Sequence, residues 1–445
     1  MTTRTRLVVR SSVVAAVSAA VFAACVHRSD HARPGAVTRA AHGGEVAAGA
    51  ERTARVALAL SGAAPSIGGT GEWRVFAEDG RELLARVPAG AEWRIERREM
   101  QLRAVGPGGS TPWRSGALIA RVVTPDAFVT FNGRRWRGEL WSHATSAGVT
   151  VVNRVAVEDY LRGVVPMELN AFAASDFAAL QAQAVAARSY VYSRLPEFEP
   201  RDVAIRQSAL PYDLRATTSD QVYAGVDVER SPADRAIATT AGLVIRYAGA
   251  VVSAPYHSSC GGSTAEPSEL WPSPESEPWL RRVSDRIPGT DRYYCDIAPR
   301  FHWTREWDEA TLRGALDRYL RAGSGVRAPV GALRDLTVQS RTPSGRVGML
   351  VVATDAGVAT LHGNDIRFAL RTIGGDILPS TYFSVDVQRD ANGGGRLSRV
   401  TIRGNGNGHG VGMCQWGAVG RARAGQDFRT ILRAYFPGAT VEPAE

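Results

Sequence analysis

The sequence contains no lysine, and all 53 of its basic residues are arginine. They are interleaved with 44 acidic residues, which leaves a formal net charge of +9. Proteins that bind nucleic acids concentrate their basic residues in a patch or stripe, whereas these arginines are spread along the whole chain. We therefore predict a solvated surface of mixed charge and no nucleic-acid partner.

The sequence also lacks a second long hydrophobic run after its N-terminus. Three arginines among the first ten residues precede an apolar run at 13–24, which is shorter than the ~20 residues that span a bilayer. The run ends in small residues before Cys25, as in a lipoprotein cleavage box with Phe22 where leucine is usual. We expect residues 1–25 to be an export signal and Cys25 to be lipidated; plain cleavage nearby or a retained anchor are the alternatives. The protein is then exported, in the periplasm or at the cell surface, and held to the membrane by a lipid anchor.

Cysteine is scarce, with four in 445 residues. Apart from Cys25 there are Cys260, Cys295 and Cys414, so at most one disulfide can close within the chain and one thiol remains. The C-x-x-C pairs typical of structural zinc are absent, and so is H-E-x-x-H. The sequence leaves the pairing of the three cysteines open.

The pattern of hydrophobic residues predicts an α+β protein of several lobes. Residues 26–52 show no apolar period and are interpreted as a flexible tether. Short alternating runs separated by turn residues predict a β-rich N-terminal lobe at 53–145. A central region of mixed helix and sheet is expected at 146–440, with an inserted lobe near 268–345.

Three segments have helical periodicity. The strongest is 175–194, where Ser175 can cap the first turn and Pro196 follows the last. Its apolar residues recur at spacings of three and four, which predicts one buried face. Further helices are predicted at 308–320 and 428–435.

A single acid, Glu168, lies inside the apolar run 160–169, just before the strongest helix. An acid in such surroundings is partly desolvated, which raises its pKa toward the range that a general acid needs. The run therefore points to Glu168 as a catalytic acid, with a glutamate in a surface turn as the alternative.

A second cluster, 256–262, holds His257 and Cys260 next to two glycines. The two side chains could act as a thiol and imidazole pair or as two metal ligands. Two ligands do not make a metal site, so zinc is kept as a minority hypothesis and no cofactor is required.

A third cluster, 404–417, contains His409 among glycines and ends near Trp416. The G-x-G-x-x-G spacing fails and too little chain follows for a dinucleotide-binding unit. A backbone rich in glycine can lie against an extended ligand, and Trp416 offers a face on which a sugar ring could stack. The alternative is a buried structural turn.

These clusters resemble the SpoIID/LytB family, named for a sporulation cell-wall enzyme and a modifier of a cell-wall amidase. The resemblance lies in ordered blocks and extends from about 54 to 440. The blocks are 152–168, 182–190, 220–225, 256–262 and 408–418.

The resemblance implies a lytic transglycosylase that acts on peptidoglycan glycan strands. Such an enzyme cleaves the bond between N-acetylmuramic acid and N-acetylglucosamine and leaves a 1,6-anhydro sugar, typically on glycan stripped of peptides. The family's catalytic glutamate falls on Glu168. One carboxyl group suffices, because the 6-hydroxyl of the sugar replaces an activated water.

Further residues of the family's groove carry over to this chain, and the blocks at 168, 257 and 409 are expected to meet across one cleft. Some relatives bind zinc near the second cluster, which would place a metal on His257 and Cys260; a disulfide between Cys260 and Cys295 would exclude it. The residues carried over as substrate-binding are Gln183, Arg188, Gln221, Tyr223, His257 and His409, to which we add Trp416. Gln183 and Arg188 could equally brace the core.

The sequence departs from the family after Glu168. The family usually has Met-Pro and an aromatic-Pro pair there, whereas this chain has Leu169-Asn170 and a longer connection, so the resemblance does not carry over the shape of the groove beside the acid. Cys414 stands where serine is common.

Two other functions remain open beside the transglycosylase. The chain could be a binding module that holds glycan for a separate amidase, as the LytB name suggests. It could also be a cysteine peptidase, with Cys260 as nucleophile and His409 as base, although Gly261-Gly262 replaces the helix start that such a nucleophile needs.

Overall fold

The computed structural model describes residues 52–198, 210–271, 277–324, 330–390 and 396–444. The predicted export signal with Cys25, and the predicted tether up to residue 51, lie outside this described part. Among the described helices, none is long and apolar enough to cross a membrane.

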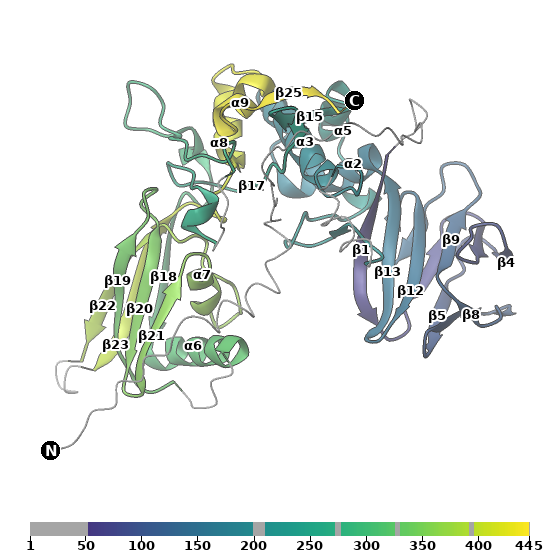
Figure 1. Cartoon of the computed structure of the whole chain (residues 1–445), viewed down its shortest axis with the longest axis horizontal. Coiled ribbons are helices and arrows are strands. Elements are labelled where there is room, and N and C mark those ends of the chain that lie inside the picture. The colour runs from purple at the N-terminus through teal and green to yellow at the C-terminus, as the bar shows by residue number, and fades with distance from the viewer. Residues whose placement is uncertain (1–51, 199–209, 272–276, 325–329, 391–395, 445) are drawn as a thin grey trace, which may run out of the picture. The chain divides into compact units, whose positions relative to one another are not determined.

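The chain forms several sheets and helices, which confirms the predicted α+β class (Figure 1). It divides into two compact units, and the division falls within helix α3 (Phe177–Tyr192). The N-terminal unit contains 52–172, the described parts of 183–253, and 442–444. The C-terminal unit contains 173–182 and the described parts of 254–441.

The N-terminal unit is built on two sheets. The first has the strand order β14-β1-β13-β12-β9-β3-β4, and its β1–β14 pair is parallel whereas its other pairs are antiparallel. Its strands are β1 (Thr53–Gly62), β3 (Trp73–Phe76), β4 (Leu83–Val87), β9 (Leu118–Val122), β12 (Glu139–Thr145), β13 (Gly148–Ala156) and β14 (Leu214–Arg215). Because β13 pairs with β1 along most of its length, the β-rich lobe predicted at 53–145 continues through residue 156.

The second sheet of this unit has the order β11-β10-β2-β5-β6-β7, with β8 pairing to β6. Trp73 of β3 in the first sheet and Trp93 of β5 in the second pack edge to face, with 6.5 Å between their ring centroids. The strands are β2 (Ser66–Gly69), β5 (Trp93–Arg98), β6 (Gln101–Gly106), β7 (Gly109–Ser110), β8 (Arg114–Ser115), β10 (Val129–Phe131) and β11 (Arg134–Trp136).

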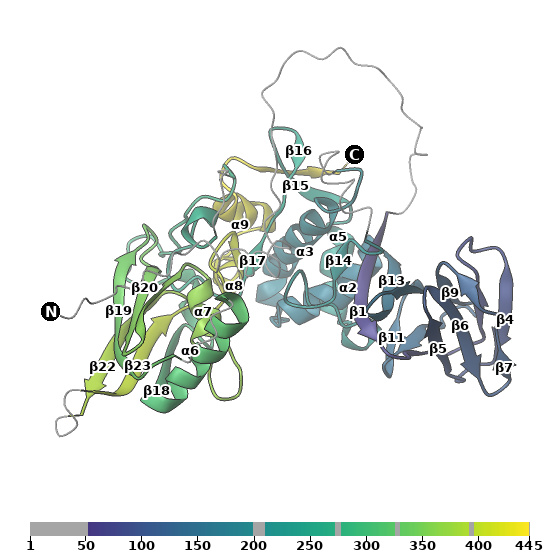
Figure 2. The ribbon, with the colours of Figure 1, turned by 60° about the horizontal axis from the view of Figure 1, so that its bottom comes forward.

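Helix α2 packs against β1 and β13 of the first sheet and against α5 (Figure 2). Helix α2 starts directly after β13, and the N–H of its first residue, Val157, donates to Arg52 O over 2.8 Å. The remaining elements of the unit are α2 (Val157–Glu168), η2 (Val226–Val228), α5 (Ser231–Thr239), β15 (Leu243–Tyr247) and β16 (Ala250–Val251). Helix α2 was not assigned from the sequence, because its internal Pro166 counts against a helix.

An ion pair joins α2 to α3. The guanidinium of Arg188 is fully buried and donates to both carboxylate oxygens of Glu158, over 2.6 and 2.7 Å. It also donates to the carbonyl of Leu243 over 3.0 Å. A bidentate pair with these additional hydrogen bonds satisfies a charge that could not be buried alone.

We expect Glu158→Ala to lower the free energy of unfolding by about 3 kcal/mol or more, because it leaves the buried guanidinium of Arg188 without its carboxylate. The measurement is urea denaturation followed by tryptophan fluorescence. The matched control is Glu72→Ala, which removes an exposed carboxylate from the same unit and should change stability by less than about 0.5 kcal/mol. Equal losses in the two variants would contradict the assigned role of this pair.

The C-terminal unit has a compact core formed by two three-stranded sheets and two helices. The sheets have the orders β18-β23-β22 and β19-β20-β21. Helices α6 and α7 lie beside these strands (Figure 1), and buried side chains of both helices join the strands in one hydrophobic cluster. The elements are β18 (His302–Asp308), α6 (Glu309–Ser324), β19 (Leu333–Arg341), β20 (Val347–Thr354), β21 (Gly357–His362), α7 (Asp365–Ala369), β22 (Phe383–Arg389) and β23 (Leu397–Asn405). The lobe predicted near 268–345 includes the first three of these elements.

The rest of this unit consists of short elements around a parallel pair of strands, β17 and β24. Helix α9 has the bounds expected from the sequence, and Asp427 caps it by accepting the N–H of Thr430 over 2.7 Å. The elements are η1 (Ala174–Asp176), β17 (Tyr256–His257), η3 (Pro267–Glu269), η4 (Tyr294–Ile297), β24 (Met413–Cys414), α8 (Gln415–Arg423) and α9 (Phe428–Tyr435), and β25 (Thr440–Pro443) closes the described chain.

Candidate functional site

Glu168 is the last residue of α2 and is half-buried. The backbone N–H of Val222 donates to its Oε1 over 2.7 Å. This bond fixes the orientation of the carboxyl group against a segment that lies 54 residues further along the chain. The carboxyl group is therefore held in place, unlike that of a glutamate in a mobile surface turn.

The segment that holds Glu168 is itself anchored by buried polar side chains. Gln221 accepts a hydrogen bond from the hydroxyl of Tyr160 over 3.0 Å and donates to Ala187 O over 3.3 Å. Tyr223 donates its hydroxyl to Asn153 Oδ1 over 2.8 Å. Burial raises the pKa of both tyrosines well above the usual value, so both stay protonated donors at any ordinary pH. Gln221 and Tyr223 thus lie on either side of Val222 as positioning residues.

Helix α2 and this segment approach each other closely at Gly163. A Cβ atom at this position would lie 2.5 Å from Tyr223 Cε2 and 3.0 Å from Gly225 O, both far inside van der Waals contact. Ala224 N–H donates to Gly163 O over 3.2 Å across the same contact. A glycine is therefore required here for the segment to reach Glu168.

Gly163→Ala should lower the free energy of unfolding by about 1–3 kcal/mol, because the added methyl group overpacks the contact with Tyr223. In an open helix the same substitution is favourable by about 1 kcal/mol. Gly314→Ala in α6 is the matched control, since a Cβ atom there meets nothing within 4 Å, and it should stabilise the protein. Thermal unfolding of the two variants measures the difference; a stabilised Gly163→Ala variant would contradict the close contact.

Two residues predicted to bind substrate lie in α3 and are buried. Arg188 is engaged with Glu158, so of the two roles left open for it, bracing the core is the one that the hydrogen bonds support. Gln183 is fully buried as well. The sequence did not identify Glu158 as the partner of Arg188, although both lie in blocks of the family resemblance.

The predicted histidines form a contact within the C-terminal unit. The rings of His257 and His409 lie 5.4 Å apart, and the ring of Trp271 lies 5.5 Å from His409. Val411 N–H donates to His409 Nδ1 over 3.1 Å, which leaves Nε2 to donate to Tyr256 O over 2.9 Å. Both ring nitrogens of His409 are therefore bonded to backbone, and its tautomer is fixed.

The environment keeps both rings neutral. Burial lowers the pKa of His409 to about 4, and the nearby Arg367 contributes in the same direction. Burial and the neighbouring His409 hold the pKa of His257 well below its usual value. His257 Nδ1 lies 3.1 Å from Val411 O, while its Nε2 is buried and makes no hydrogen bond to any described residue.

His409 should make stability fall as the pH drops from about 6.5 to about 4. In this range the unfolded chain binds a proton at His409 and the folded chain does not, so protons favour unfolding; above 6.5 both states are neutral there. Urea denaturation between pH 7.5 and 4.5 measures this slope. In His409→Gln, which has no imidazole to titrate, we expect a shallower slope, and an unchanged slope would contradict the assignment.

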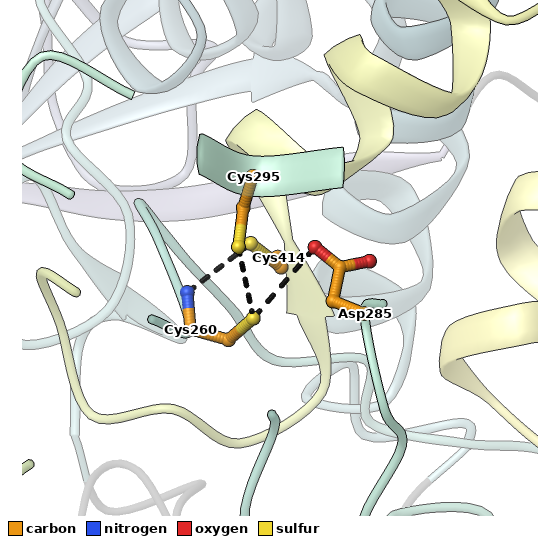
Figure 3. A group of neighbouring side chains, drawn as sticks. All are labelled: Cys260, Asp285, Cys295 and Cys414. Carbon is orange, nitrogen blue, oxygen red and sulfur yellow. Dashed lines mark hydrogen bonds between the residues drawn. The ribbon is translucent and has the colours of Figure 1, made fainter. Parts of the chain in front are cut away.

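The buried thiols lie together in the C-terminal unit (Figure 3). Cys260 Sγ is 3.4 Å from Cys295 Sγ and 3.8 Å from Asp285 Oδ2, and Cys260 N–H donates to Cys414 Sγ over 3.2 Å. The three cysteines are free thiols. The sequence offered no spacing that singles out Asp285.

The cysteine-peptidase hypothesis does not fit this geometry. Cys260 is fully buried, and the nitrogens of His409 are bonded to the backbone of Val411 and Tyr256. A nucleophile must reach substrate, and its base must reach the thiol. Neither condition is met.

The remaining predicted contact, Trp416, lies in α8 and is half-buried; its backbone N–H donates to Ser258 O over 3.0 Å. Glu168 belongs to the N-terminal unit, whereas His257, His409 and Trp416 belong to the C-terminal unit. The convergence of these residues on one cleft stays a prediction.

Comparison with known proteins identifies the family to which this chain belongs. The family model described as "Stage II sporulation protein" (SpoIID) matches residues 145–247. An uncharacterized protein of Brachyspira hyodysenteriae is 30% identical over 327 residues, which cover 72% of this chain and 75% of that protein. Two Bacillus subtilis proteins also match: the amidase enhancer, 30% identical over 63% of this chain and 40% of its own length, and stage II sporulation protein D, 25% identical over 66% and 76%. The chain belongs to the SpoIID/LytB family.

The SpoIID match contains Glu168 and the elements from β13 through α2 and α3 to the segment around Val222. A second family model, "Domain of unknown function (DUF8618)", matches 280–412 and so contains the compact core of the C-terminal unit. The SpoIID/LytB chain spans less than half of the amidase enhancer's length.

Proposed function

We propose that this SpoIID/LytB protein is a peptidoglycan lytic transglycosylase with Glu168 as its general acid and base. The substrate is the bond between N-acetylmuramic acid and N-acetylglucosamine in glycan strands, with strands free of peptide as the preferred form. The observation that supports this most directly is the carboxyl of Glu168, half-buried at the end of α2 and held by Val222 N–H.

Two opposed electrostatic effects act on Glu168. The C-terminal end of a helix carries partial negative charge, which disfavours a second negative charge there. The N–H of Val222, 2.7 Å from Oε1, favours the carboxylate. A residue that alternates between acid and base must take both forms, and opposed effects of this kind are compatible with that role.

The proposed reaction uses one carboxyl group twice. Because Oε1 accepts the N–H of Val222, the proton of the neutral acid is assigned to Oε2. It passes to the leaving glycosidic oxygen as the bond to the anomeric carbon breaks. The carboxylate then takes the proton of the sugar's 6-hydroxyl, whose oxygen bonds to the anomeric carbon and gives the 1,6-anhydro product. No water is consumed, and the enzyme returns to its starting protonation state.

In this mechanism Gln221 and Tyr223 are positioning residues. Their hydrogen bonds fix the segment around Val222, whose N–H orients the carboxyl group of Glu168. His257, His409 and Trp416 are assigned to glycan binding as part of the same proposal, in which the indole of Trp416 offers a face for a sugar ring. Membership of the SpoIID/LytB family supports a peptidoglycan-related function for the chain as a whole. An export signal and lipidation at Cys25 would place the enzyme outside the cytoplasmic membrane, next to its substrate.

Glu168→Gln should reduce release of anhydro sugars by at least ~10³-fold, because the amide has no proton to give and cannot accept one. The substrate is purified glycan treated with an amidase to remove peptides, and the products are identified by mass spectrometry. The melting temperature should change little, since glutamine keeps an oxygen for the N–H of Val222.

Glu72→Gln is the control, because it neutralises an exposed carboxylate of the same unit and should keep full activity. If Glu168→Gln were folded and still released anhydro products at the wild-type rate, the assignment of the acid would be wrong.

The alternative is a glycan-binding enhancer of an N-acetylmuramoyl-L-alanine amidase without activity of its own. The relative named amidase enhancer favours it. The same variant separates the two functions: an enhancer keeps full stimulation of an amidase in Glu168→Gln, and its wild-type form releases no anhydro sugar.

A further inference from the structure

The C-terminal unit buries three thiols and a carboxyl group at one point (Figure 3). The Sγ atoms of Cys260, Cys295 and Cys414 and a carboxylate oxygen of Asp285 all lie within 4.8 Å of one another. All four residues are fully buried, and the proposed reaction at Glu168 uses none of them. Four polar, ionisable groups in a dry interior need a partner that balances them.

We propose that Cys260, Asp285, Cys295 and Cys414 form a tetrahedral zinc site that stabilises the fold of the C-terminal unit. Three thiolates with one carboxylate are a donor set that suits Zn²⁺, which prefers four ligands in structural sites. The sequence suggested His257 beside Cys260 as ligands, but the four-residue group does not include His257, whose Nδ1 lies against Val411 O.

The spacing of the donor atoms fits a metal better than a disulfide. Bonds of ~2.3 Å to sulfur and ~2.0 Å to oxygen give a tetrahedron with edges of roughly 3.5–3.8 Å. The observed separations from Cys260 Sγ are 3.4 Å to Cys295 Sγ and 3.8 Å to Asp285 Oδ2. A disulfide has sulfurs ~2.0 Å apart, and it would use only two of the three clustered thiols.

The surroundings of the cluster hold its members as the outer shell of a metal site does. Tyr435 donates its hydroxyl to Asp285 Oδ1 over 2.7 Å, and Arg421 lies 3.3 Å from the same oxygen. The other oxygen, Oδ2, faces Cys260. Such outer hydrogen bonds orient a ligating carboxylate and balance its charge.

Backbone N–H groups converge on Cys414. Its Sγ accepts the N–H of Cys260 over 3.2 Å and the N–H of Gly417 over 3.3 Å. Cys414 is the N-cap of α8, so the positive end of this helix adds to the two bonds. These contacts fix the position of Cys414 Sγ, as outer hydrogen bonds do for a metal-bound sulfur.

The position of the ligands explains what a metal would do. Cys260 follows β17, Asp285 lies in the irregular stretch after η3, Cys295 lies in η4 and Cys414 joins β24 to α8. The stretch between β17 and β18 has little regular secondary structure among its described residues. One ion would cross-link these four segments, and its burial leaves no open position for substrate, so the proposed role is structural.

The direct test is the zinc content of the full chain, purified without chelators under reducing conditions and measured by inductively coupled plasma mass spectrometry. We expect about one zinc ion per chain, and at least a tenfold lower ratio in Cys414→Ser and in Asp285→Asn. Asp296→Asn is the matched control: Asp296 follows Cys295 directly but pairs with Arg292 outside the cluster, so zinc content should be unchanged.

Tyr435→Phe tests the outer hydrogen bond and keeps all four ligands. We expect it to weaken zinc affinity about 10–100-fold in competition with a chromophoric chelator. For wild-type protein, replacing zinc by cobalt should give the intense visible absorption of tetrahedral thiolate coordination, a readout that does not require a variant to fold.

The proposal is overturned if the full chain contains no zinc, binds no cobalt and shows the two-dalton mass loss of a disulfide between two of these cysteines. It is equally overturned if Cys414→Ser or Asp285→Asn keeps a full complement of zinc. These outcomes are independent of the reaction at Glu168.

Discussion

The close approach of α2 to the 221–225 segment at Gly163 is the contact on which the geometry of the Glu168 carboxyl depends. A side chain at Gly163 would meet Tyr223 and Gly225 before the segment could come near enough for Val222 to donate its N–H. Tyr160 and Asn153 then fix the residues on either side of Val222. The ion pair of Glu158 with Arg188 joins α2 to α3 from within the same unit. The chemistry proposed for a single carboxyl group thus depends on packing that fixes the position of one peptide N–H.

The sequence predicts an element well when the interactions that determine it lie within a few residues. It predicts an element poorly when they come from distant parts of the chain. Helix α9 was predicted with its observed bounds because its cap at Asp427 and its apolar period lie within a few residues. Helix α2 was missed because Pro166 is unfavourable inside a helix, whereas packing of its buried face against neighbouring elements outweighs that cost. Its last residue is Glu168, so an acid expected in an apolar run before a helix is in fact presented by a helix end.

The candidate sites show the same contrast. Glu168, Gln221 and Tyr223 could be selected from ordered blocks, and the structure joins them through Val222. The partner of Arg188 and the fourth member of the cysteine cluster could not be selected, because both depend on contacts between segments far apart in the chain. Glu158 is 30 residues from Arg188, and Asp285 is 25 residues from Cys260, with no spacing rule to connect either pair.

The cysteine cluster also bears on how the protein matures. Cys260 and Cys414 are 154 residues apart, so their side chains can meet only after much of the C-terminal unit has assembled. Until then each thiol is separately exposed to whatever oxidants surround the emerging chain. The final state of the cluster therefore depends on whether the unit assembles before its thiols are oxidised. That order depends in turn on the compartment in which the polypeptide first folds.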